Sequence, residues 1–223
     1  MDAVKHKEEG ASMRFDIRRE TEEDFRAVEE LTREAFWNLN SPGCEEHYLV
    51  HILRSHADFL PELDLVATHG AEIAASILYS RSRVEDVPTV TFGPLSVLPA
   101  YQRMGAGSAL VRHTLSLCRE RGERAIVIYG DPAYYARFGF RPAEEFDICT
   151  ADGMYAAALQ VLELWPDSME GVHGRFFESP AFEVDVRAAE AFDKDFPRRP
   201  KRETPTQRHF QALAAMRRPR LRR

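Results

Sequence analysis

The sequence predicts an α/β (α+β) fold with a central sheet, and three stretches of its 223 residues predict it. The apolar residues of 95–98 are typical of a buried strand that Pro99 ends, because proline has no N–H for the strand ladder. A glycine turn over 102–107 leads directly into good helix formers. The apolar run 125–129 has the composition of a second buried strand. Strand, helix and strand in succession indicate a sheet covered by helices.

Local signals place the other elements in order along the chain. Alternating apolar and polar residues over 14–18 predict the first strand, and Thr21 before three acidic residues predicts a helix N-terminus. Gly93-Pro94 predicts a bulge or an unpaired edge within its strand. Asp131-Pro132 has the N-cap and first-turn residues of a short helix. The expected strands are 14–18, 63–68, 72–79, 89–98, 125–129, one within 154–165, 171–181 and 182–186, and the expected helices are 21–36, 45–55, 106–121, 132–138 and 206–217.

Composition and cysteine usage exclude several classes of protein. Hydrophobic residues make up 44% of the chain and charged residues 30%, as in soluble globular proteins. No window approaches eighteen apolar residues, so no membrane span is predicted. Residues 1–12 are polar and predict a disordered leader rather than a secretory signal. Cys44, Cys118 and Cys149 are scattered, which argues against a disulfide framework or a zinc ribbon and for a reducing, cytoplasmic location.

Charge is distributed unevenly along the chain. The net charge is −6, but residues 198–223 carry +9 and the remainder −15. An acidic body favours a cationic acceptor over a nucleic acid. We expect a single folded domain over 13–187, and a basic linker and C-terminal tail, with room for a short helix, over 188–223. A nucleic-acid or partner-binding arm is an alternative interpretation of this tail, although it has few interleaved aromatic residues.

The turn Gln102-Arg103-Met104-Gly105-Ala106-Gly107, continued by Ser108, has the composition of an anion-binding loop. A helix N-terminus leaves its first N–H groups without internal partners and carries about half a positive charge. Glycines let the backbone approach an anion without a Cβ in the way. The turn therefore predicts a phosphate site, with an ordinary strand–helix connection as the alternative interpretation.

A second motif, Gly130-Asp131-Pro132-Ala133-Tyr134-Tyr135-Ala136-Arg137-Phe138-Gly139-Phe140, follows about 25 residues later. The two motifs in this order resemble those of the GNAT N-acetyltransferase superfamily, and the resemblance covers roughly residues 15–186. It implies a mixed, mostly antiparallel central sheet with helices on both faces. It also implies a splayed pair of parallel strands at the cofactor site, which the break at Gly93-Pro94 fits.

The resemblance implies acetyl-CoA as the cosubstrate and no metal. The pantetheine arm would lie along the backbone of Leu95, Ser96 and Val97, as an added strand would. Tyr135 and Phe138 are expected beside the thioester. The pyrophosphate would be bound by the backbone of Gln102, Arg103, Met104, Gly105, Ala106, Gly107 and Ser108.

The reaction implied is direct attack of a primary amine on the thioester in a ternary complex, and a small molecule is the expected carrier of that amine. Tyr135 would protonate the departing thiolate, while Tyr134 is expected to point to another face of the helix. Packing in the core is the alternative role for Tyr135. The base that accepts the amine proton is left open among ordered water and the carboxylates of Glu45, Glu46, Glu85, Asp86 and Asp131.

The resemblance places the acceptor under the segment that follows the first helix, so Trp37, Asn38, Glu45 and Glu46 are the candidate substrate residues. The alternative roles are that Trp37 caps the core and that Glu45 and Glu46 belong to a solvated helix face. A Cys44–His47 nucleophilic pair and a His47–His51 metal pair are weaker hypotheses. A CoA-binding sensor or adaptor with little catalysis is the alternative function, and a homodimer is compatible with the resemblance.

Overall fold

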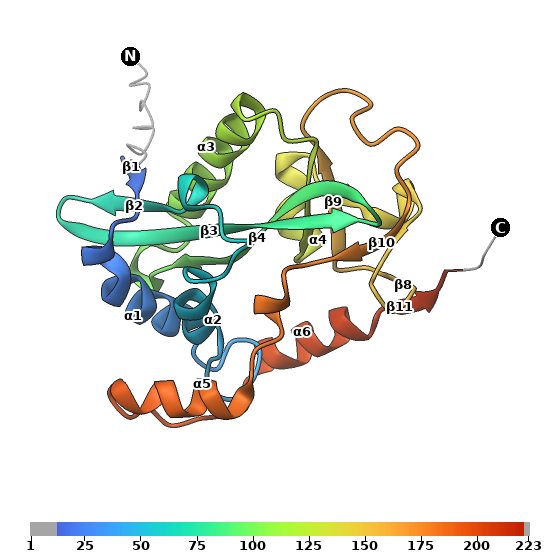
Figure 1. The fold of residues 1–223 in the computed structure, drawn as a ribbon. Helices are drawn as coiled ribbons and strands as arrows, with labels where there is room; N and C mark the ends of the chain where they lie inside the picture. The colour runs from blue at the N-terminus through green and yellow to red at the C-terminus, as the bar shows by residue number, and fades with distance from the viewer. Residues whose placement is uncertain (1–12, 221–223) are drawn as a thin grey trace, which may run out of the picture.

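The computed structural model describes residues 13–220, which form one central sheet with helices on both faces (Figure 1). The expected leader, 1–12, and the last three residues of the basic tail lie outside the described residues. The strands are β1 (Asp16–Arg19), β2 (Leu65–His69), β3 (Glu72–Val84), β4 (Val87–Val97), β5 (Ala125–Tyr129), β6 (Arg141–Pro142), β7 (Ile148–Cys149), β8 (Met154–Ala156), β9 (Leu159–Glu163), β10 (Gly174–Phe177) and β11 (Arg217–Pro219). The helices are α1 (Phe25–Phe36), α2 (Glu46–Leu53), α3 (Ala106–Glu120), α4 (Pro132–Tyr135), α5 (Val186–Phe192) and α6 (Pro205–Ala215).

The sheet is mixed and mostly antiparallel, as the sequence predicted. Its main path runs β1-β2-β3-β4-β5-β9-β6, with β10 joined to β3 and β7. The one parallel pair on this path, β4 and β5, is joined at Val90 and Ile126 only. Beyond this point β4 continues to Val97, so its second half keeps an edge that β5 does not cover. The splayed parallel pair that the sequence predicted is therefore present.

Alternate residues of the strands pack against helices on opposite faces of the sheet. Ile77 belongs to a core with Leu110 of α3, whereas the next residue, Leu78, packs in a core with Val28 of α1 and Leu53 of α2. This alternation follows from the two-residue period of a strand. It fixes α3 on one face and the α1–α2 pair on the other (Figure 1).

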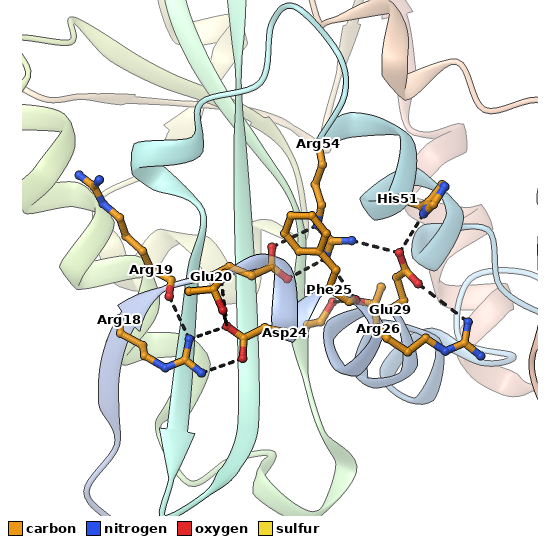
Figure 2. A network of polar contacts seen from close by, with 12 residues as sticks. Arg18, Arg19, Glu20, Asp24, Phe25, Arg26, Glu29, His51 and Arg54 are labelled. Atoms are coloured by element: carbon orange, nitrogen blue, oxygen red, sulfur yellow. Dashed lines mark hydrogen bonds and ion pairs between the residues drawn. The ribbon is translucent and has the colours of Figure 1, made fainter.

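A buried ion network joins α2 to the start of α1 (Figure 2). The guanidinium of Arg54 donates to Glu20 Oε1 at 2.7 Å and to Glu29 Oε1 at 3.1 Å. Asp64, which precedes β2, lies beside Glu20, and burial together with this carboxyl raises the pKa of Asp64 well above its usual range. The network holds the α1–α2 pair in place and so positions the loop between these helices.

The segment after β10 differs from the sequence-based prediction. Only Gly174–Phe177 of the expected strand 171–181 is extended in the sheet, and the strand expected over 182–186 is absent. Instead Asp185 acts as the N-cap of α5, because its side chain accepts the backbone N–H groups of Arg187 and Ala188. Phe182, Val184 and Val186 alternate with acidic residues as in a strand, but the N-cap at Asp185 favours a helix that begins at Val186.

Residues 200–220, which we call the C-terminal strap, cross the molecule from the α1–α2 loop to β8 (Figure 1). At the first end, Thr204 Oγ1 and the amide of Gln207 both donate to the carbonyl of Asn38, at 2.8 and 3.0 Å. At the other end, β11 pairs with β8. The helix expected over 206–217 is α6, and it spans the distance between these anchors. Within residues 13–220, no helix is both long and apolar enough to cross a bilayer.

Candidate active site

The glycine turn bends so that the amides at the start of α3 face a common space. Gly105, the N-cap of α3, has φ +100°, a left-handed conformation that favours glycine. The helix start leaves the N–H groups of Ala106, Gly107 and Ser108 without partners inside the helix. The N–H groups of Gln102 and Met104, which we had expected to face an anion, instead donate to the carbonyls of Pro99 and Tyr101.

A cavity of about 660 Å³ opens in front of these amides. Leu95 and Val97 of β4 form one wall, and Gly105 to Ser108 lie at the end where α3 begins. Its charged lining side chains, among the residues described, are Arg103 and Arg137, both basic. A helix N-terminus flanked by two guanidinium groups attracts phosphate groups.

Some of the predicted cofactor residues lie away from this cavity. Ser96 is buried and its hydroxyl donates to Thr32 of α1, so only its backbone can face a ligand. The lining of the cavity includes neither Met104, whose side chain is exposed, nor Phe138, which packs on Tyr134. Arg137, in contrast, was missed by the sequence reasoning, although its place two residues after Tyr135 could have identified it.

A second cavity, of about 900 Å³, adjoins the first. The two share Phe36 and Leu39, at the end of α1, and Tyr134 and Tyr135 of α4. The rest of the second cavity lies between the C-terminal end of β5, the β7–β9 region and α6. Two ligands could therefore bind side by side and meet at the shared wall.

Comparison with known proteins identifies the family. The model of the acetyltransferase (GNAT) family matches residues 25–140. The chain belongs to this family.

Relatives of this GNAT chain include proteins of known structure. The Escherichia coli K12 protein YhbS, an uncharacterized N-acetyltransferase, is 35% identical over 162 residues, which cover 71% of this chain and 92% of YhbS. The crystal structure of Escherichia coli YhbS in complex with CoA matches with a TM-score of 0.70 and 30% identity, over 80% of this chain and 97% of that one. A GNAT acetyltransferase from Brucella melitensis in complex with acetyl-CoA matches with a TM-score of 0.62 and 29% identity, over 76% of this chain and 99% of that one. The GNAT chain is accordingly an acetyl-CoA-dependent N-acetyltransferase.

Both tyrosines of α4 line the two cavities of the GNAT site. Their rings are 4.9 Å apart and nearly perpendicular. Burial raises the pKa of Tyr135 well above its usual value, so its phenol stays protonated at neutral pH. A Cβ added to Gly130 would lie 2.3 Å from the Tyr135 ring, so glycine at this position leaves room for that ring.

Of the carboxylates considered as bases, only Asp131 lines a cavity among the described residues. Asp131 Oδ1 accepts the N–H of Ala133 as the N-cap of α4, and Oδ2 lies 3.2 Å from Nε2 of His209 on α6. Glu85 instead accepts the N–H of Arg175, and neither Glu85 nor Asp86 lines the cavities. His209 was not considered in the sequence analysis, because only the folded chain brings residue 209 beside residue 131.

None of the four predicted substrate residues lines either cavity, and two of them hold the C-terminal strap instead. Trp37 Nε1 and Asn38 Nδ2 both donate to the carbonyl of Pro200, at 3.2 and 3.1 Å. Glu46 accepts a hydrogen bond from Asn40 at 2.8 Å, while Glu45 is half-buried and its pKa is raised by burial. The neighbouring residues Phe36, Leu39 and Asn40 line the second cavity. The neighbours of the predicted residues, and not the predicted residues themselves, therefore line this cavity.

The hypothesis of a Cys44–His47 nucleophile does not fit the structure. The thiol of Cys44 donates to Glu46, and burial together with this carboxylate raises the pKa of the thiol far above its usual value. His47 is buried against Phe192 and Phe196, and burial lowers its pKa to about 4. His51 pairs with Glu29 at 2.9 Å, and no group of three or more potential metal ligands is found within residues 13–220.

Proposed function

We propose that this enzyme transfers the acetyl group of acetyl-CoA to the primary amine of a small molecule, by direct attack within a ternary complex. The observation that carries the proposal is the pair of adjoining cavities that share Tyr134 and Tyr135. One has an anion-binding helix N-terminus, and the other is covered by α6 and has the size of a small-molecule site. The CoA and acetyl-CoA bound to the relatives support the assignment of the first cavity.

In this proposal the start of α3, with Arg103 and Arg137, binds the phosphates of acetyl-CoA. The uncovered edge of β4 at Leu95 and Val97 binds the pantetheine arm, which leads the thioester toward the shared wall. Acetyl-CoA supplies the activated acyl group. The phenol of Tyr135 donates a proton to the departing thiolate, a role to which its protonated state is suited.

Calorimetry with CoA tests the phosphate site. Gly105 and Gly70 both have positive φ, and a Cβ added to either meets nothing within 4 Å, so the two make a matched pair. Gly105→Glu places a carboxylate at the start of α3 and is expected to weaken CoA binding at least tenfold, about 1.4 kcal/mol. Gly70→Glu, in the β2–β3 turn, is expected to bind CoA within twofold of the wild type. Equal affinity of the two variants would contradict the proposed phosphate site.

Release of free thiol from acetyl-CoA on addition of an amine tests the transfer. A panel of primary amines is expected to contain substrates that increase thiol release and yield the N-acetylated product by mass spectrometry. Acetyl-CoA binding without amine-dependent thiol release would instead favour the CoA sensor.

A further inference from the structure

The second cavity, which the proposed function assigns to the acceptor, is closed by the C-terminal strap. Phe210, Leu213 and Ala214 of α6 form one wall, facing Phe36 and Leu39 of the α1–α2 loop. Most of the remaining lining is also apolar or aromatic, including Tyr129, Ala156 and Ala158. Such a wall binds an apolar body better than a polar chain.

The charged groups that line this cavity, among the described residues, are the carboxylates of Asp131 and Asp152 and the guanidinium of Arg217. Asp152 is paired with Arg217 of the strap at 2.5 Å. The Asp131 carboxylate, beside His209, is the one without a guanidinium partner. The cavity therefore accommodates one cationic group next to Asp131, and a second cation would meet apolar surface.

The geometry of His209 suits a proton acceptor. Its Nε2 lies 3.2 Å from Asp131 Oδ2, and the neutral tautomer whose Nε2–H donates to this carboxylate has a free lone pair on Nδ1. A carboxylate that orients one ring nitrogen while the other accepts a proton is a recurring arrangement in acyl transfer. The side chain is 72% exposed, so a proton taken from the substrate can pass on to water.

We propose that the C-terminal strap completes the acceptor site, with His209 as the catalytic base, Asp131 as its positioning residue and an apolar wall that selects monoamines carrying an aromatic or aliphatic body. The inference rests on the proposed function. The substrate ammonium gives a proton to Nδ1 of His209, and the neutral amine attacks the thioester carbonyl carbon. The C–S bond breaks, the attacking nitrogen loses its second proton to the thiolate through Tyr135, and His209 returns its proton to water.

The first experiment compares amines with the full-length wild-type enzyme. Tryptamine and 2-phenylethylamine are expected to have kcat/KM values at least tenfold above those of ethanolamine and spermidine. Phe210→Ala, which removes part of the wall, is expected to reduce this preference at least fivefold while leaving the Kd for CoA unchanged. A preference for spermidine would overturn the assigned substrate class.

The second experiment tests the base. His209→Asn is expected to lower kcat/KM for 2-phenylethylamine at least tenfold near pH 7 and to leave the Kd for CoA within twofold of the wild type. Added imidazole, or a pH closer to the pKa of the amine itself, is expected to restore part of the activity. Gln211→Ala, on the same helix but outside the cavity, is the control and is expected to match the wild type.

The pH profile separates catalysis from a structural effect. The wild type is expected to lose activity on the acid side, and His209→Asn is expected to lack this limb. Asp131→Asn keeps the N-cap oxygen for Ala133 but removes the charge, and is expected to lower kcat for 2-phenylethylamine while leaving the Kd for CoA within twofold of the wild type. The other charged groups of the cavity, Asp152 and Arg217, are paired with each other.

Glu178 requires its own control, because burial raises its pKa to about 7 and its charge acts on Tyr129. Glu178→Gln is expected to keep the acid limb. If His209→Asn is as active as the wild type, or if Glu178→Gln loses the acid limb of the pH profile, the proposed role of His209 is overturned. A wild type that binds CoA but acetylates no amine would overturn the proposed function and this inference together.

Discussion

Two adjacent tyrosines line the wall shared by the two cavities, and their surroundings differ. Tyr135 packs beside Phe92 and Phe140, with ring centroids 5.8 and 5.6 Å away. Tyr134 packs on Phe138, and its hydroxyl would lie 3.4 Å from a Cβ added to Gly107. Tyr135 therefore packs among core aromatic rings, whereas the hydroxyl of Tyr134 lies near the start of α3.

This difference predicts opposite effects of two matched substitutions. Tyr135→Phe removes the proposed donor and is expected to lower kcat about 10- to 100-fold with little change in the Kd for CoA. Tyr134→Phe is expected to change kcat by less than threefold. Steady-state thiol release and calorimetry on both variants measure these effects. A larger loss of kcat in Tyr134→Phe would transfer the donor role to that residue.

At the scale of elements, the ion network of Figure 2 determines how the α1–α2 pair responds to pH. Burial and the neighbouring Glu20 hold the Asp64 carboxyl in its neutral form well above the pH at which it ionises in the unfolded chain. At pH values above about 4, unfolding of the protein therefore releases a proton from Asp64. The contribution of Asp64 to stability is full below that pH and is lost as the pH rises through the folded pKa.

Asp64→Asn tests this linkage, because an amide has the shape of the neutral acid but does not ionise. The wild type is expected to lose up to about 1.4 kcal/mol of unfolding free energy per pH unit from this group above pH 4, and the variant to lack that slope. Urea unfolding of both proteins at several pH values measures the difference. Parallel stability curves would mean that Asp64 is ionised in the folded protein.

The elements that the sequence predicted well are those with local signals. The glycine turn, α3, β5 and α4 each have a cap, a breaker or an apolar run within a few residues. The segment 182–186 was expected to be a strand that completes the sheet, although Asp185 before Val186 is an N-cap signal for α5. His209 was missed because only the fold brings it beside Asp131, which a single sequence does not show. Arg137 lies within the second motif and was overlooked there.

At the scale of the whole molecule, the strap explains why an acidic body is followed by a basic tail. Arg217 pairs with Asp152, Arg218 with Glu144, and Arg220 with Asp147. Arg199 pairs with Glu34 in the same way before the strap begins. These arginines are engaged within the protein, so their charge serves to hold the C-terminal segment against the acidic body. Exposed pairs of this kind contribute little singly, and the buried anchor at Gln207 adds specificity.

Releasing that anchor is expected to affect the acceptor more than CoA. Gln207 donates to the carbonyls of Asn38 and Arg202, and it also belongs to the capping box of α6. Gln207→Ala is expected to cost about 1–2 kcal/mol locally, to increase hydrogen exchange in α6 and to raise KM for the amine several-fold. The Kd for CoA is expected to stay unchanged. Unaltered hydrogen exchange in α6 would show that the other contacts of the strap are enough to hold this helix in place.

The wall that joins the two cavities has a practical consequence for inhibitor design. A conjugate in which the sulfur of CoA is tethered to the nitrogen of an arylalkylamine could occupy both chambers at once. Binding of its second half would be intramolecular, so such a bisubstrate compound should bind far more tightly than either component, provided that its linker spans the wall that the two cavities share at Tyr134 and Tyr135.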